Sequence, residues 1–412
     1  MEQTVPKGNK IAVVGAFSRY NYGDILMPIV VREMLGRRNG HLAFDFYSYR
    51  NSDLSEIGGI PSKSLSDLYN DLAKGKFDWV VVAGGQVLGQ EHRRMLPLEL
   101  KTKSATKSFI TQIGFKAFGK IAPGLLNRIC RGAVGIQATF PWIIEGDESA
   151  ARTIYNTVGG NYRYSNSLNR QASRLLALSP YFTTRSRSDF EIWKDAGVGC
   201  KLVPDSVACI SRIFEAEILS NLVREQTKSN ISSLGDYFIF QISRENAFRR
   251  EAEIAQYIQS SVAATGLQCM LVPMGYAAGH EDDTALRNIA KRCDQRVYLL
   301  DNASVHEITY AISRADAYLG TSLHGAIVSS SYGVPHTTIC VPNKKTQEYL
   351  ESWKSTRLFS TNLSDLASAA KYLINDNENR RYTAVKSIEI INRVEEHFDL
   401  MAKMITEACE AA

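Results

Sequence analysis

The chain has 412 residues, of which 44% are hydrophobic and 22% are charged, with a net charge of +5. These proportions are ordinary for a globular protein, and the length exceeds what one core usually holds, so we expect two domains. The mild net charge does not indicate a partner made of nucleic acid.

Cysteine usage and hydropathy point to one compartment. The seven cysteines are scattered and form no CxxC pair, which favours a reducing environment and no cysteine-built metal site. The first ten residues lack the apolar core of a signal peptide, and no run of about 18 apolar residues occurs. We therefore expect a cytoplasmic protein without a membrane-spanning segment.

The first half alternates strand-like and helical patterns. Strands are predicted at Lys10–Phe17, Ala43–Tyr49 and Phe77–Gly85, with a further one within Ala133–Glu145. A helix is predicted over 21–38, and 174–198 should be a strand that enters a helix at Ser186 or Ser188. This alternation predicts a parallel, doubly wound α/β layer.

The second half repeats that rhythm after a polar helical stretch at 211–235. Strands are predicted within 235–243, 267–275, 296–301, 316–325 and 336–341, and a helix over 305–315. We expect an N-terminal α/β domain over 1–210, a C-terminal α/β domain over 211–375 and a helical tail over 376–412. Two Rossmann-like domains of this kind would face a cleft, as in a GT-B-like architecture, with ligands at the carboxyl ends of the strands.

Two glycine-containing turns follow strands of the first half. "NYGD" places Asn21, Gly23 and Asp24 at a helix start, where free N–H groups favour anions and a carboxylate can cap. Gly84 and Gly85, followed by Gln86, permit a positive φ or a close backbone approach. Each turn is either a plain connection or a loop that faces the cleft.

Residues 101–131 are basic and contain no Asp or Glu, and apolar residues recur among the lysines and arginines at helical spacing. Such a segment can pack on the domain with a solvated basic face. It can also lie on an anionic membrane surface.

Three polar positions follow predicted strands. Arg185 precedes a helix, where a guanidinium can bind an anion or pair with a nearby acid such as Asp189. Arg244 follows the first strand of the second half, with a surface ion pair as the alternative. His324 stands at a strand-to-helix corner, where an imidazole can transfer protons or fill a structural position.

No metal-ligand spacing is present in the sequence. "GHEDDT" (Gly279–Thr284) holds four polar residues in a row, which cannot all point toward one ion. We interpret it as a loop that caps the next helix, and we expect no metal.

Taken in order, several short segments resemble the polysaccharide pyruvyl transferase family. The resemblance covers roughly residues 10–345 and rests on "NYGD", "DWVVVAGGQVLG", "IYNTVGG", "TTRSRSDFEIWKDAGV", "LVPDS" and "GTSLHGAIVSSSYGVP". It implies a GT-B-like fold and transfer of a pyruvyl unit from phosphoenolpyruvate to a sugar hydroxyl pair. The acceptor would be a surface polysaccharide, such as an exopolysaccharide, or its lipid-linked precursor, and no cofactor is implied.

The resemblance also assigns residues to roles. It implies His324 as a catalytic proton handler, with Asp24 orienting the sugar hydroxyl or acting as base. Pyruvyl-donor binding falls to Arg185, with Arg244, Lys344 and Lys345 as further cations and Ser322, Leu323 and Gly325 around the histidine. Many family members have arginine where Ser322 stands, so another cation must meet the donor. Asn21, Gly23, Gly84, Gly85 and Gln86 would form the acceptor or cleft loops.

Two alternatives remain open on the sequence. One is transfer from a nucleotide sugar on the same fold, for which Glu307 could hold a ribose. The other is a non-catalytic saccharide-binding relative, which Ser322 leaves open. For the enzyme we expect a cytoplasmic location, with a peripheral position at the inner face of the membrane if 101–131 binds lipid.

Overall fold

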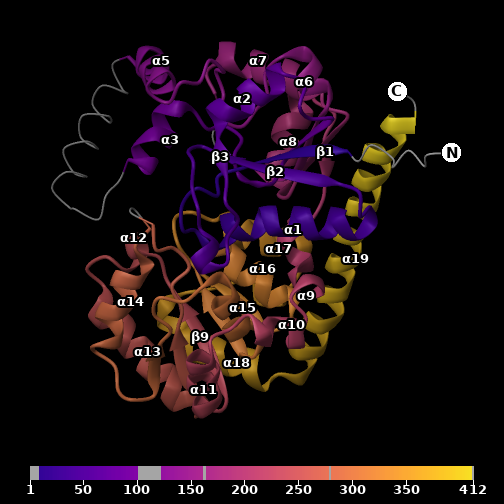
Figure 1. The fold of residues 1–412 in the computed structure, drawn as a ribbon. Helices are drawn as coiled ribbons and strands as arrows, with labels where there is room; N and C mark the ends of the chain where they lie inside the picture. Colours follow the sequence, from indigo (N-terminus) through magenta and orange to yellow (C-terminus); the bar gives the residue numbers. More distant parts are fainter. Residues whose placement is uncertain (1–8, 101–121, 161–163, 278–279, 411–412) are drawn as a thin grey trace.

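A computed structural model describes residues 9–100, 122–160, 164–277 and 280–410 (Figure 1). It contains two parallel sheets, which come from the two halves of the chain. In the first sheet the order is β3-β2-β1-β4-β6-β7-β8, with β5 paired to β6. Its strands are β1 (Lys10–Val14), β2 (Ala43–Ser48), β3 (Lys63–Ser64), β4 (Trp79–Val82), β5 (Gly85–Gln86), β6 (Thr153–Gly159), β7 (Tyr181–Thr184) and β8 (Lys201–Leu202).

The second sheet has the order β11-β10-β9-β12-β13-β14, and all its pairings are parallel. Two strands follow on one side of β9 and three on the other, which is the strand order of a Rossmann-type sheet. Its strands are β9 (Tyr237–Gln241), β10 (Gln268–Leu271), β11 (Val297–Leu299), β12 (Ala317–Gly320), β13 (His336–Ile339) and β14 (Ser360–Thr361). The predicted doubly wound α/β class with two Rossmann-like layers is confirmed.

Helices cover the sheets and connect the strands. In the first half they are α1 (Tyr22–Arg38), α2 (Leu65–Ala73), α3 (His92–Glu99), α5 (Pro123–Ala133), α6 (Asp147–Ala151), α7 (Asn166–Ala177) and α8 (Arg187–Asp195). In the chain, α9 (Ile210–Ile213), α10 (Ala216–Asn221) and α11 (Glu225–Leu234) come after the last strand of the first sheet and before the first strand of the second. The second half has α12 (Arg244–Ala247), α13 (Glu251–Thr265), α14 (Asp282–Ala290), α15 (Val305–Ser313), α16 (Leu323–Ser331), α17 (Lys345–Trp353), α18 (Leu366–Asn375) and α19 (Asn377–Glu410). Short 3₁₀ turns are η1 (Ser55–Ile57), η2 (Ser206–Cys209) and η3 (Leu363–Asp365).

The β1 strand shows why these apolar runs form buried parallel strands. Ile11 and Val13 pack into one hydrophobic cluster, whereas Ala12 and Val14 pack into another on the opposite face. Successive strand side chains point to opposite faces, so a strand with both faces covered must be apolar throughout.

The largest hydrophobic cluster joins the two halves. It includes apolar residues of α1 from the first half and of α15, α16 and α19 from the second. Helix α1 lies between the two layers, and α19 runs along the side of the molecule past both of them (Figure 1). Because α19 packs on both halves, the division of the chain at residues 210 and 375 stays a proposal.

The strand predicted within Ala133–Glu145 was wrong. That segment is an irregular loop whose apolar side chains, among them Phe140 and Trp142, are buried. The Glu145 carboxylate accepts hydrogen bonds from the amides of Thr139 and Phe140, so these amides are satisfied without a ladder. The strand lies instead at β6, which overlaps the segment "IYNTVGG".

Candidate active site

A cleft of about 1230 Å³ lies between the two sheets. Asn21 lines it from the loop after β1, and Gln86 lines it from the short strand β5 that follows β4. Gln241 and Ser322 line it from the ends of β9 and β12. In each sheet these are the two strands at which the strand order reverses, and the crevice at such a point is where α/β sheets bind ligands. The topology therefore brings two such crevices face to face.

Three ionisable side chains meet at one corner of this cleft. The Arg185 Nη1 atom lies 2.5 Å from Asp205 Oδ2, and both side chains are buried. The His324 Nε2 atom lies 3.4 Å from Arg185 Nη1 and 3.6 Å from Asp205 Oδ2. Arg185 and His324 both line the cleft, whereas Asp205 lies behind them and is fully buried.

Asp205 is held as a carboxylate. Burial alone would raise its pKa, but the Arg185 guanidinium, His324 and the Val207 amide more than offset that effect and hold the pKa well below the ordinary value. Its Oδ1 accepts a hydrogen bond from Val207 at 2.9 Å, and its own amide donates to the Tyr349 hydroxyl at 3.2 Å. The result is a fixed negative charge behind the two cleft-facing groups.

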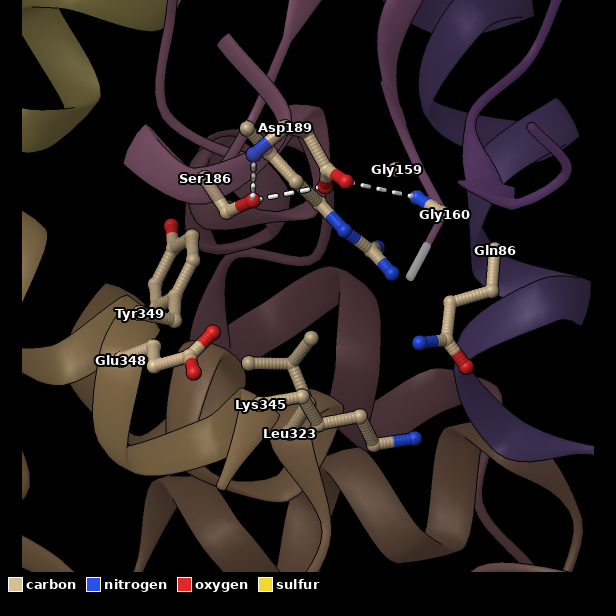
Figure 2. Close-up of a pocket in the computed structure, with 10 residues that line it drawn as sticks. Gln86, Gly159, Gly160, Ser186, Asp189, Leu323, Lys345, Glu348 and Tyr349 are labelled. Carbon is tan, nitrogen blue, oxygen red and sulfur yellow. Dashed lines mark hydrogen bonds between the residues drawn. The ribbon is translucent and has the colours of Figure 1, made fainter. Parts of the chain in front are cut away.

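Local structure after β7 fixes Arg185. The Ser186 hydroxyl caps α8 by accepting from the Asp189 amide, so of the two predicted starting points Ser186 is confirmed. Asp189 in turn accepts a hydrogen bond from the Gly160 amide at 3.2 Å (Figure 2). At Gly159 a β-carbon would come within 3.0 Å of Arg185 Nε, so a side chain there would press on the guanidinium.

His324 lies in the first turn of α16. The Ser322 hydroxyl caps this helix by accepting from the Gly325 amide at 3.3 Å, and the Ser322 amide donates to Gln241 Oε1 at 2.8 Å. The imidazole is only 8% exposed and lies against Gly23 of α1. Its ring is thus held by elements from both halves of the chain.

Lys345 adds a cation beside Arg185. It begins α17 and lines both the cleft and a small adjoining pocket, where its side chain extends toward the side on which Gln86 lies (Figure 2). Burial and the nearby Arg185 lower its pKa, and the carboxylates of Asp24 and Asp282 act in the opposite direction. Two cations that line the same cleft and pocket suit a ligand that brings its own negative charge.

The structure gathers most of the sequence-predicted residues in this cleft. The residues that line it are Asn21, Asp24, Gln86, Arg185, Ser322, Leu323, His324 and Lys345. Arg244 does not line it, and its guanidinium pairs with Glu281 at the start of α14. Gly23 and Gly325 do not line it either; they are buried in α1 and α16.

Gly84 and Gly85 determine the backbone conformation just before Gln86 in the cleft wall. They adopt φ values of 111° and 86°, which only glycine takes readily. A β-carbon at Gly85 would lie 3.4 Å from Asp24 Oδ1. The two glycines therefore let the backbone that leads to Gln86 pass close to the Asp24 carboxylate.

Sequence reasoning missed two acidic residues. Asp205 lies in the quoted segment "LVPDS", where an acid after a short strand was the available signal. Asp282 lies in "GHEDDT", which was interpreted as a helix cap. Glu281 occupies the cap position without a side-chain hydrogen bond to the helix, and Asp282 is buried and lines the cleft. The segment therefore leads into α14 as predicted, but the position of Asp282 in the cleft wall was not predicted.

Other predictions concern metals, membranes and nucleotides. The described residues contain no group of three or more His, Cys, Asp or Glu placed to hold a metal ion, and none of their helices is both long and apolar enough to cross a membrane. Of the basic segment, 101–121 lie outside the described residues. Glu307 does not face the cleft: it is fully buried and pairs with Arg224 and Thr227.

Two Rossmann-like sheets that face each other across a cleft define the GT-B-like class of α/β proteins. Solved structures of this class are similar in fold. The UDP-GlcNAc 2-epimerase of Neisseria meningitidis bound to UDP-GlcNAc has a TM-score of 0.57 at 13% identity, over 96% of this chain and all of that one. The Methanocaldococcus jannaschii UDP-GlcNAc 2-epimerase in complex with UDP-GlcNAc and UDP has 0.53 at 12%, over 93% and 98%.

The family is defined more narrowly by the sequence. The family model for polysaccharide pyruvyl transferase matches residues 21–339, which include every residue of the Arg185, Asp205 and His324 cluster. The chain belongs to this family. No curated protein matches it.

Proposed function

We propose that this protein transfers the pyruvyl unit of phosphoenolpyruvate to a hydroxyl pair of a saccharide. The saccharide is a bacterial-type surface polysaccharide, such as an exopolysaccharide, or its lipid-linked precursor. The observation that carries the proposal is the corner where Arg185, His324 and Lys345 meet, in a cleft with room for a sugar chain. Family membership supplies the reaction class.

The charges of this corner suit phosphoenolpyruvate. Its carboxylate and phosphate need fixed positive charge, which Arg185 and Lys345 supply from opposite halves of the chain. Asp205 neutralises part of the Arg185 charge and fixes the guanidinium in place. Lys345 thus supplies the positive charge that an arginine at position 322 would otherwise give. Ser322 instead caps α16.

The acceptor would enter on the side of the first half. Asp24, Asn21 and Gln86 line that wall with oxygen and amide groups that suit sugar hydroxyls. His324 takes the proton of the attacking hydroxyl, because its imidazole lies between this wall and the pyruvyl-donor corner. The proposed reaction uses no redox cofactor and no metal.

The alternatives have weaker support. Nucleotide-sugar transfer would need an acid for the ribose, and the buried Glu307 carboxylate is already paired with Arg224. A non-catalytic saccharide-binding protein would not need two cations beside a cleft histidine. For location we propose the cytoplasm, at the inner face of the membrane when the acceptor is lipid-linked.

Incubation with phosphoenolpyruvate and candidate oligosaccharides tests the function. Phosphate release should accompany a product whose mass corresponds to a ketal-linked pyruvate. Turnover of a nucleotide sugar, with no pyruvylated product from any acceptor, would contradict the proposal.

A further inference from the structure

Asp282 is a buried acid in the wall of the cleft, at the first residue of α14. It is 4% exposed. Its Oδ2 accepts hydrogen bonds from Gln241 Nε2 at 3.1 Å and from the Met274 amide at 3.4 Å. Its Oδ1 is buried and accepts none from the described part of the chain. A bare carboxylate oxygen in such a place is costly, so the site favours a protonated carboxyl or a ligand that bonds Oδ1.

The orientation of this carboxyl is fixed through Gln241. The Gln241 Oε1 atom accepts hydrogen bonds from the amides of Thr321 and Ser322, at 2.9 and 2.8 Å. The amide of Gln241 must therefore turn its NH₂ group toward Asp282 Oδ2, which leaves Oδ1 as the proton-bearing atom. Ser322 in turn caps the helix of His324, so one hydrogen-bonded support holds the acid and the histidine at the same edge of the cleft.

Several ionisable groups surround Asp282. Asp283 is its neighbour on α14 and pairs with Arg287 at 3.0 Å. The Arg244 amide of α12 lies close enough to lower the pKa of Asp282, although the Arg244 guanidinium is paired with Glu281. The other titratable groups around it are the buried Tyr318 hydroxyl of β12, Lys345 of α17 and His280 of the loop before α14.

The balance of these groups sets the pKa of Asp282 near neutrality. Burial is the largest influence on this pKa, and together with the Asp283 charge it outweighs the hydrogen bonds from Met274 and Gln241 and the influence of the nearby Arg244 amide. The pKa is raised to about 7. A group that titrates there is suited to general acid–base catalysis at physiological pH.

We propose that Asp282, as a neutral carboxylic acid, is a second proton-transferring residue of this cleft and protonates the methylene carbon of the bound donor. The inference rests on the proposed function and adds the acid that pyruvyl transfer requires beside a base. Phosphoenolpyruvate must gain a proton at C3 as its C2 accepts the sugar oxygen. His324 and Asp282 divide these two tasks.

The protons balance over two steps. In the first, the sugar hydroxyl bonds to C2, His324 takes its proton, and the electrons of the double bond take the Asp282 proton at C3 to form a methyl group. In the second, the other hydroxyl bonds to C2 and gives its proton to the Asp282 carboxylate. The C2–O bond to phosphate breaks with its electrons on oxygen, and His324 protonates the departing phosphate. Both residues return to their starting states.

The test compares wild type with Asp282→Asn, and with Asp283→Asn as the matched control. Asparagine can accept from Gln241 and Met274 as the carboxyl does, so the variant should fold. Its kcat should fall by about 10²–10⁴. Wild-type activity should decline as pH rises through about 7, because the acid is then ionised. Asp283→Asn should keep its maximal kcat, with that decline moved to lower pH because a charge that raises the Asp282 pKa is gone.

Binding gives a readout that needs no turnover. By calorimetry, the dissociation constant of phosphoenolpyruvate for the wild type should rise about tenfold from pH 7 to pH 8.5, because the ionised carboxylate repels an anionic ligand. This rise is counted relative to any change that Asp282→Asn shows over the same pH range. Parallel binding profiles, or an Asp282→Asn variant with wild-type kcat, would overturn the inference while leaving the proposed function intact. The expected binding profile without phosphate release from any acceptor would support the neutral carboxyl and contradict the function.

Discussion

The imidazole of His324 lies so close to Gly23 that a β-carbon there would come within 1.8 Å of Nδ1. Gly23 belongs to α1 of the first half, and His324 belongs to α16 of the second. The histidine ring therefore packs directly against the glycine of "NYGD". Its role is to leave space for the ring, so it belongs to the site without lining the cleft.

Gly23→Ala should displace His324 and lower kcat at least tenfold, with a smaller change in KM for the pyruvyl donor. Gly36→Ala is the control, because it lies in the same helix and its β-carbon would meet nothing within 4 Å. That change should stabilise α1 by up to about 1 kcal/mol. Equal kcat values for the two variants would contradict the packing argument.

Asp205→Asn should lower the free energy of unfolding by about 3–5 kcal/mol, because it leaves the buried Arg185 charge unpaired. The exposed pair of Arg174 and Asp147 offers the control, and Asp147→Asn should cost less than about 1 kcal/mol. Because the Asp205 pKa is lowered on folding, its contribution is complete above the ordinary Asp pKa of about 4 and is lost as pH falls below it. Denaturant unfolding between pH 3 and 7 should show the beginning of this loss below about pH 4 in wild type, with a reduced slope in Asp205→Asn.

Lys345→Met should weaken binding of phosphoenolpyruvate by about tenfold to a hundredfold, which corresponds to one hydrogen bond to a charged group. The melting temperature should hold or rise, since burial already disfavours the charged form of Lys345. Lys344 is exposed and next to it, so Lys344→Met is the control for net charge. Similar dissociation constants for both variants would remove Lys345 from the site.

His324→Asn should lower kcat by about 10²–10⁴-fold and change the melting temperature little. His336→Asn should lower the melting temperature and change kcat little. The ring of His336 is buried and bonded on both nitrogens, to the Val334 carbonyl and the Ser355 hydroxyl. A loss of stability without a loss of kcat in His324→Asn would make its role structural.

Docking to a membrane can be tested on α5, where Leu125 and Ile129 are exposed beside Arg128. The double change Leu125→Ser and Ile129→Ser should reduce co-sedimentation with anionic vesicles several-fold, and not with neutral ones. Ile218→Ser on α10 with Leu222→Ser just after it is the control, because those side chains are similarly exposed in a segment without the basic run. An equal effect of both pairs would show unspecific adhesion.

Most of the fold follows from local patterns. Apolar β-branched runs such as the one at β4 predict a strand because both faces of a parallel sheet must be covered. The same argument wrongly predicts a strand within 133–145. The apolar residues of this loop are buried by tertiary packing, and Glu145 accepts hydrogen bonds from two of its amides. Composition alone does not distinguish these two ways of burying an apolar segment.

The site could be predicted only where its signal is local. Arg185 and His324 each follow a strand, so their edge of the sheet is evident from the sequence. The pairing of Arg185 with Asp205, and the placement of Asp282 beside Gln241, depend on which strands become neighbours. Short-range spacing does not contain that information, and this is why both acids were missed.

Helix α19 links the stability of the two halves. His397 of this helix bonds Asn156 at 2.8 Å and Tyr181 at 3.0 Å, and Asn9 bonds the Ile405 carbonyl at 2.9 Å. The first sheet thus receives part of its packing from α19, which follows the whole second sheet in the chain. The packing of the N-terminal half is therefore complete only when α19 is in place, so the two halves depend on each other for stability.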